Sequence, residues 1–98
     1  MKIIWSPLAI ERITEIARYI AEDNLAAAQK WVEAIFVKVE QVRAAPASGR
    51  IVPEVNRKEI REIIFGNYRI VYRMEPENIS ILTVRHGRQI LPVDEIVA

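Results

Sequence analysis

The chain of 98 residues contains no cysteine, only three glycines and a single histidine. Without cysteine there is no disulfide framework, no thiolate nucleophile and no cysteine-based zinc site, and we expect no metal or other cofactor. No apolar run approaches the roughly 18 residues that a membrane-spanning helix needs, and the first residues lack the apolar core of a signal peptide. The simplest expectation is a bacterial-type cytoplasmic protein that does not enter a membrane.

The composition is that of a folded domain. Hydrophobic residues make up 51% of the chain and charged residues 28%, a balance that fits a globular protein and not a disordered tail. A chain of this length has room for one core of modest size. We therefore expect residues 1–98 to form a single domain.

The net charge of +1 conceals an uneven distribution of charge along the chain. Residues 1–48 hold six basic and six acidic side chains, whereas residues 49–88 hold eight basic and five acidic ones. The basic residues of the second half are Arg50, Arg57, Lys58, Arg61, Arg69, Arg73, Arg85 and Arg88. Arginines that cluster in space favour a surface for an anionic partner.

Two helices are predicted in the first half. Ser6 supplies a hydroxyl N-cap, and Pro7 suits the first helical position because its missing N–H costs nothing there. Apolar residues then recur at helical spacing until the pattern breaks near Asn24. A second apolar stripe begins near Leu25 and ends before Pro46. So short a connection predicts an antiparallel helix hairpin.

Strands are predicted at the start of the chain and in its second half. The expected ranges are 2–5, 59–65, 67–74 and 79–86, and turn residues separate the last three. These three ranges should form an antiparallel meander. The fold class predicted is α+β, with an N-terminal strand and a helix hairpin packed on a three- to four-stranded antiparallel sheet.

Alternation along the middle strand predicts which face carries the arginines. Arg69 and Arg73 should lie on one face, with Tyr68 and Tyr72 on the other. We expect the apolar face to meet the helices and the arginine face to remain open. On the preceding strand, alternation groups Arg61 with apolar neighbours, and on the last strand either Arg85 or His86 shares the face of Arg69. The apolar segment 90–98 is expected to be a last short element or a segment ordered by a partner.

Several motifs taken together resemble the RelE/ParE family of toxins. The motifs are Trp5-Ser6-Pro7, Gly49-Arg50 with Pro53-Glu54, Ile60-Arg61-Glu62, Gly66-Asn67-Tyr68-Arg69-Ile70-Val71-Tyr72-Arg73 and Val84-Arg85-His86-Gly87-Arg88. The resemblance covers nearly the whole chain. It implies the toxin of a type II toxin–antitoxin module, neutralised by a cognate antitoxin and able to form a hetero-oligomer with it.

The family divides by target, and the resemblance implies one of two activities. RelE-like members cleave messenger RNA on the ribosome, whereas ParE-like members poison DNA gyrase and block replication. Metal-free RNA cleavage needs a base, an acid and cations around the phosphate. The nuclease branch usually carries a tyrosine after the last strand, but this chain has none after Tyr72. That departure favours the ParE-like, gyrase-directed branch.

The predicted target-binding residues are Arg61, Arg69, Arg73, Arg85, His86 and Arg88. In the alternative, a ribosome-dependent endoribonuclease, Glu54 or His86 would act as the base while Arg61 and Arg69 hold the phosphate. A third hypothesis is a non-toxic nucleic-acid-binding module, whose binding would weaken steeply with salt. Ordinary ion pairs compete for Glu54 and for Arg61, and the aromatic residues are interpreted as core.

Overall fold

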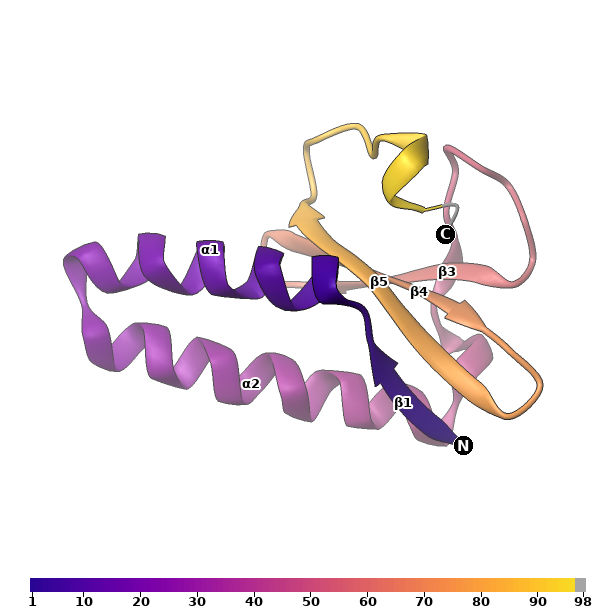
Figure 1. Ribbon diagram of the computed structural model, residues 1–98, viewed down its shortest axis with the longest axis horizontal. Helices are drawn as coiled ribbons and strands as arrows, with labels where there is room; N and C mark the ends of the chain where they lie inside the picture. The colour runs from indigo at the N-terminus through magenta and orange to yellow at the C-terminus, as the bar shows by residue number, and fades with distance from the viewer. Residues whose placement is uncertain (97–98) are drawn as a thin grey trace.

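The computed structural model describes residues 1–96 and places two helices in the first half of the chain. Helix α1 spans Pro7–Asp23 and α2 spans Leu25–Ala44, and they lie side by side as an antiparallel pair (Figure 1). Both predicted ranges are confirmed. The turn between the helices extends beyond the sheet, so this end of the hairpin has no strand beneath it (Figure 1).

Side-chain caps explain where the helices begin. The Ser6 hydroxyl accepts a hydrogen bond from the Ala9 N–H at 3.0 Å, and Pro7 occupies the first helical position. Asn24 ends α1 and starts α2, because its side chain accepts from the Ala27 N–H at 3.0 Å. Each cap satisfies a donor that a helix start leaves unpaired.

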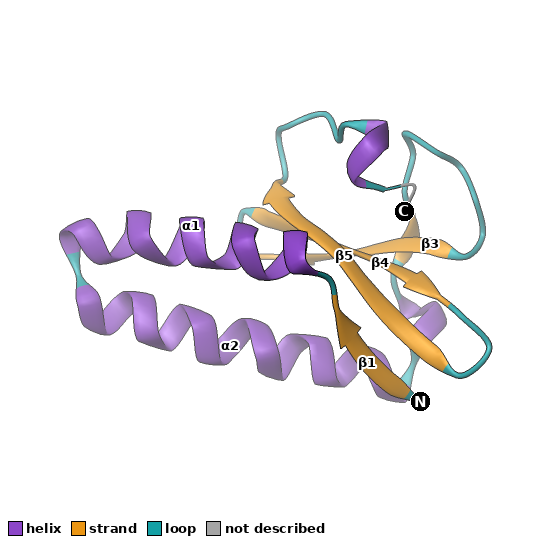
Figure 2. Cartoon of the chain, viewed as in Figure 1, coloured by secondary structure: helices purple, strands orange, loops and turns teal. Residues whose placement is uncertain are grey.

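Within residues 1–96, five strands form one sheet in the order β1-β5-β4-β3-β2 (Figure 2). The strands are β1 (Lys2–Trp5), β2 (Arg50–Ile51), β3 (Ile60–Phe65), β4 (Tyr68–Met74) and β5 (Asn78–His86). Strands β2 to β5 are antiparallel neighbours, and β1 pairs in parallel with β5. The predicted α+β class and antiparallel meander are confirmed, with the two-residue β2 as an addition. Two short 3₁₀ helices, η1 (Pro46–Ser48) and η2 (Val93–Glu95), complete the elements.

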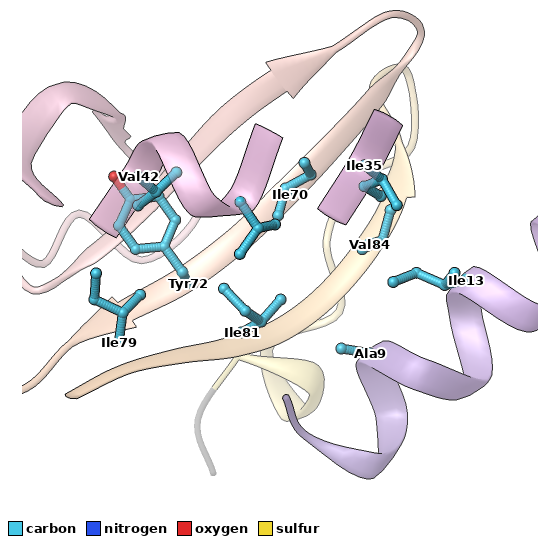
Figure 3. Packing of buried hydrophobic residues seen from close by; sticks show 10 residues of the cluster. Ala9, Ile13, Ile35, Val42, Ile70, Tyr72, Ile79, Ile81 and Val84 are labelled. Carbon is cyan, nitrogen blue, oxygen red and sulfur yellow. The ribbon is translucent and has the colours of Figure 1, made fainter. Parts of the chain in front are cut away.

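The main core lies between the helices and one face of the sheet. Ile35 and Val42 of α2 pack with Ile70 and Tyr72 of β4, and α1 presents its buried side chains to β5 (Figure 3). All four of these residues are no more than 1% exposed. The apolar alternation predicted for β4 is therefore confirmed for its helix-facing side.

A second core covers the opposite face of the sheet, where an open arginine surface was expected. Its buried members are Val52, Ile60, Val71, Leu82, Leu91 and Ile96. The loop between β2 and β3 and the segment after β5 supply part of this cluster. The prediction of an open face is wrong because Val71 and Leu82 point to that side, and these apolar side chains need a cover. Arg69 lies beneath the same cover and is 4% exposed.

Strand β1 shields only the first half of β5. Its register runs from Lys2 opposite Asn78 to Trp5 opposite Ile81. The chain then turns, with the Ser6 hydroxyl donating to the Leu82 carbonyl at 2.9 Å, and enters α1. Helix α1 therefore packs beside the far end of β5 and approaches the segment that follows this strand. No helix in residues 1–96 is long and apolar enough to cross a membrane.

Candidate functional site

The sheet face beneath the second core contains a buried ion pair between Glu54 and Arg69. Two terminal nitrogens of the Arg69 guanidinium donate to the two Glu54 carboxylate oxygens, each at 2.8 Å. The Arg69 side chain is 5% exposed and that of Glu54 20%. Paired, two-pronged geometry of this kind is the strong form of an arginine–carboxylate interaction. The Glu54 carboxylate also accepts from the Leu91 N–H at 3.0 Å.

The network continues through Glu62 on β3. Its carboxylate accepts from the Arg69 Nε at 2.6 Å and from Arg50 on the neighbouring strand β2. The Glu62 side chain is fully buried, while Arg50 is largely exposed. The desolvation of these charges is offset because each buried carboxylate has an arginine partner. Arg69 thus lies between two acids and has few donors left for an external ligand.

A second ionic cluster joins η2 to the sheet and to α1. Glu95 accepts two hydrogen bonds from Arg85 of β5, at 2.7 and 3.0 Å, and also binds Arg12 of α1. The Glu95 side chain is 8% exposed. Arg12 has a second partner, Glu15, on the exposed side of the helix. Arg85 pairs in register with Arg69 and lies on the same face of the sheet. Of the two residues that the sequence left open, Arg85 and not His86 therefore shares the face of Arg69.

The hydrogen bonds change the proton affinities of these acids. The pKa of Glu54 is lowered to about 2, and the hydrogen bonds from Arg69 are the largest cause. Burial of the carboxylate acts in the opposite direction and would raise this pKa. Arg85 is the largest cause of the lowered pKa of Glu95. Both carboxylates are therefore ionised at neutral pH, and neither has the affinity for a proton that a general base needs.

Arg61 lies on the other face of the sheet from Arg69. Its guanidinium donates to the carbonyl oxygens of Lys58, at 2.8 Å, and Gly49, at 3.1 Å. The grouping of Arg61 with the apolar side of β3 is consistent with this position. Arg61 and Arg69 are thus separated by the sheet, and the structure does not bring them together around one phosphate.

His86 also lies away from the ion pair of Glu54 and Arg69. It pairs in register with Tyr68, and their rings meet edge to face with centroids 5.8 Å apart. The His86 Nδ1 accepts from the backbone N–H of Arg88 at 3.2 Å, which places the proton of a neutral ring on Nε2. His86 therefore faces the helix side, near Arg12 and Gln89 in a cleft of about 290 Å³.

The remaining predicted arginines differ in exposure. Arg88 is exposed, whereas Arg73 is partly buried and donates to the Ile96 carbonyl at 3.3 Å. The structure therefore brings Arg69, Arg73 and Arg85 together beneath the second core, and leaves Arg61, His86 and Arg88 elsewhere.

Sequence reasoning did not assign Glu62, Glu95 and Arg12 to this site. For Glu62 a signal existed, because it occupies an inward position of β3, opposite Val71. An acid at such a position needs a buried cation. Glu95 and Arg12 are 83 residues apart in the sequence, and nothing local connects them.

A separate apolar groove is lined by residues of both helices. It has a volume of about 800 Å³. Its lining includes Ile10, Ala17, Ala21, Leu25, Val32 and Phe36, and its charged residues are Arg18 and Glu33. Ile10, Leu25 and Phe36 are 42%, 64% and 38% exposed. Several apolar side chains exposed in one groove are typical of a surface for a partner.

Comparisons with known proteins agree on one family. Residues 3–91 match the family model described as the ParE toxin of the type II toxin–antitoxin system parDE. The chain is 36% identical over 93 residues to a protein of Sinorhizobium fredii (strain NBRC 101917 / NGR234) named "Putative toxin Y4kP", with 93% of each chain covered. The fold also matches the solved "Chromosomal ParDE TA system from P. aeruginosa" with a TM-score of 0.73 and 19% identity, over 88% of this chain and 95% of that one.

The fold is thus that of a RelE/ParE-superfamily toxin, as the resemblance implied. The chain belongs to the ParE family of toxins of type II toxin–antitoxin systems. An antitoxin partner follows from membership in this family.

Proposed function

We propose that residues 1–98 act in the cytoplasm as a single-domain toxin that binds and poisons DNA gyrase, without covalent chemistry of its own. Membership in the ParE family supports this target, and so does the arrangement of the candidate catalytic groups. The observation that carries the proposal is that each candidate base is already hydrogen-bonded and that neither lies beside an arginine available to a phosphate.

The two candidate bases fail for different physical reasons. Both oxygens of Glu54 are bound to Arg69, one also to the Leu91 N–H, and its pKa is held at about 2. His86 uses its Nδ1 lone pair on the Arg88 N–H and lies on the helix side of the sheet. Metal-free cleavage by the RelE-like route would need at least one of these groups to take a proton from the 2′-hydroxyl.

We further propose that the groove between α1 and α2 binds the antitoxin. Its apolar floor fits the apolar face of an amphipathic helix, and the adjacent Arg18 and Glu33 would pair with opposite charges on that helix. The groove extends to Leu25, the first residue of α2, which is 64% exposed. Toxin and antitoxin would then form a hetero-oligomer.

The experiment that tests the function titrates the antitoxin-free protein into supercoiling of relaxed plasmid by purified gyrase. Inhibition with accumulation of cleaved DNA is the expected result. The RelE-like alternative predicts cleavage of messenger RNA on the ribosome and no effect on gyrase. A plain nucleic-acid-binding module predicts neither, and instead direct binding of DNA or RNA that weakens steeply with salt.

A further inference from the structure

The segment from Arg88 to Ile96, which we call the C-terminal strap, covers the second face of the sheet. Leu91 and Ile96 are its buried apolar members, at 2% and 0% exposure, and they pack in the cluster that contains Val71 and Leu82. Between them Val93 is 53% exposed. The strap thus touches the sheet at separate points.

The backbone of the strap is not part of the sheet ladder. Its backbone hydrogen bonds run to residues three positions away, from the Gln89, Glu95 and Ile96 N–H groups to the His86, Pro92 and Val93 carbonyls respectively. The bonds from Glu95 and Ile96 stay within the strap when it moves, and the bond from Gln89 joins its start to the last residue of β5. Opening of the strap would therefore leave the hydrogen bonds between β4 and β5 intact, which is the condition for a local opening.

Side chains hold the strap to the rest of the protein. The Leu91 N–H donates to Glu54, and the carbonyls of Gln89 and Ile96 accept from Arg69 and Arg73.

Among these attachments, Glu95 makes the largest number of hydrogen bonds, three in all, to two arginines. It places one carboxylate between the guanidinium groups of Arg12 and Arg85. A carboxylate in a cradle of two arginines is the arrangement that an acidic ligand would need.

We propose that the strap opens as a unit, and that the surface beneath it binds a segment of a partner protein with the same chemistry as the strap. That chemistry is two aliphatic side chains in the positions of Leu91 and Ile96, with a carboxylate in the position of Glu95. The surface offers an apolar floor at Val71 and Leu82 and the cationic cradle at its edge. It is distinct from the groove between the helices, and the proposal does not depend on gyrase as the target.

A tethered strap has an advantage over any free competitor. A segment on a short linker has an effective concentration in the millimolar range. A free peptide therefore binds weakly until the strap loses one of its own attachments. Replacing the Glu95 carboxylate weakens the strap most selectively. It removes the negative charge that binds Arg12 and Arg85 and leaves the apolar contacts of the strap unchanged.

Hydrogen exchange of the full chain tests the opening. We compare the wild type with Glu95→Gln and with the control Glu15→Gln, which removes the other carboxylate bound to Arg12, at a site 52% exposed. We expect the amides of residues 89–96 to exchange at least tenfold faster in Glu95→Gln, with β4 unchanged. If the amides of the strap exchange at the same rate as those of β4 in all three proteins, the strap opens only when the whole protein unfolds. That result would overturn the proposal.

Binding of a labelled peptide tests the surface. The probe is a fluorescent peptide with the sequence of residues 88–96, added to each full-length protein. We expect Glu95→Gln to bind it at least tenfold more tightly than the wild type or Glu15→Gln does. A peptide carrying glutamine in place of the glutamate should lose this advantage. Failure of Glu95→Gln to bind the peptide, or equal binding of both peptides, would rule out the proposed partner surface even if the strap opens.

Discussion

Glu54 and Arg69, 15 residues apart in the sequence, form a two-pronged ion pair with both N–O distances at 2.8 Å. Glu54 comes from the loop between β2 and β3, and Arg69 from the middle of the sheet. Through the Leu91 N–H the same carboxylate also fixes the C-terminal strap. One carboxylate thus joins three parts of the chain on a face that alternation alone would leave open.

Replacement of Glu54 by glutamine should destabilise the fold. Arg69 would keep Glu62 but lose a charged partner in a buried position, which costs roughly 2–3 kcal/mol in the free energy of unfolding. Urea unfolding measures the loss. The matched control is Glu59→Gln, which removes an acid paired with Arg57 at the surface. Exposed pairs contribute little to stability, so equal losses for the two variants would contradict the role given to Glu54.

The free energy of unfolding should decrease as the pH falls through the range between the unfolded and folded pKa values of Glu54. Its pKa is lowered from 4.5 to about 2 on folding, so the unfolded state binds a proton first as the pH falls. The contribution of Glu54 is therefore complete above about pH 4.5 and is lost progressively toward about pH 2. The difference in unfolding free energy between wild type and Glu54→Gln should shrink across this window. A difference that stays constant from neutral pH to about pH 3 would be incompatible with this pKa.

Gly49→Ala should destabilise the protein through a clash at Tyr72. An added Cβ would lie 2.7 Å from the Glu62 carbonyl oxygen and closer still to the Tyr72 hydroxyl. This hydroxyl accepts from the Gly49 N–H at 3.1 Å and donates to the Pro46 carbonyl at 2.6 Å, so it has little room to move. Overpacking of this kind costs about 1–3 kcal/mol.

A double-mutant cycle with Tyr72→Phe isolates that clash. The phenylalanine removes the hydroxyl but keeps the ring, so Gly49→Ala should cost less in this background than in the wild type. Thermal or urea unfolding of the four proteins gives the coupling energy. If the destabilisation by Gly49→Ala is the same with and without the Tyr72 hydroxyl, the added methyl group does not clash with that hydroxyl.

Leu25→Glu should weaken binding of the antitoxin without unfolding the toxin. Leu25 is 64% exposed and lines the groove between the helices, so a charge there is tolerated in the free protein but opposes an apolar partner. We expect at least a tenfold loss of affinity by calorimetry with the cognate antitoxin. Val37→Glu is the control, because Val37 is similarly exposed, at 60%, on the same helix but does not line the groove. Equal effects of the two variants would place the antitoxin elsewhere.

The helices and the meander were predictable because their signals are local. Ser6, Pro7 and Asn24 mark the helix starts, and apolar periodicity marks the buried faces. The cover of the second face was not predictable, because it depends on contacts that the loop between β2 and β3 and the segment after β5 make with residues distant in sequence. Alternation along β5 would place Leu82 on the helix side with Val84, but the register shift between Val71 and Tyr72 leaves it without a partner on β4 and places it in the second core.

The sequence predicted which arginines share a face of the sheet, but it did not predict which side chains they contact. Arg69, Arg73 and Arg85 do share a face, but Arg69 and Arg85 already have buried acidic partners. The sequence contains those acids, yet no local pattern indicates which arginine each one meets. Exposed Arg88 is therefore the predicted target-binding residue that is best placed to reach another protein.

Gyrase supercoiling with the antitoxin-free protein is the most direct test of the proposed function. Wild type should inhibit supercoiling and accumulate cleaved DNA. Arg88→Ala should require at least tenfold more protein, whereas Lys30→Ala, at another exposed cation, should match the wild type. Folded protein that leaves gyrase unaffected at every concentration, while cleaving messenger RNA on the ribosome, would contradict the proposal.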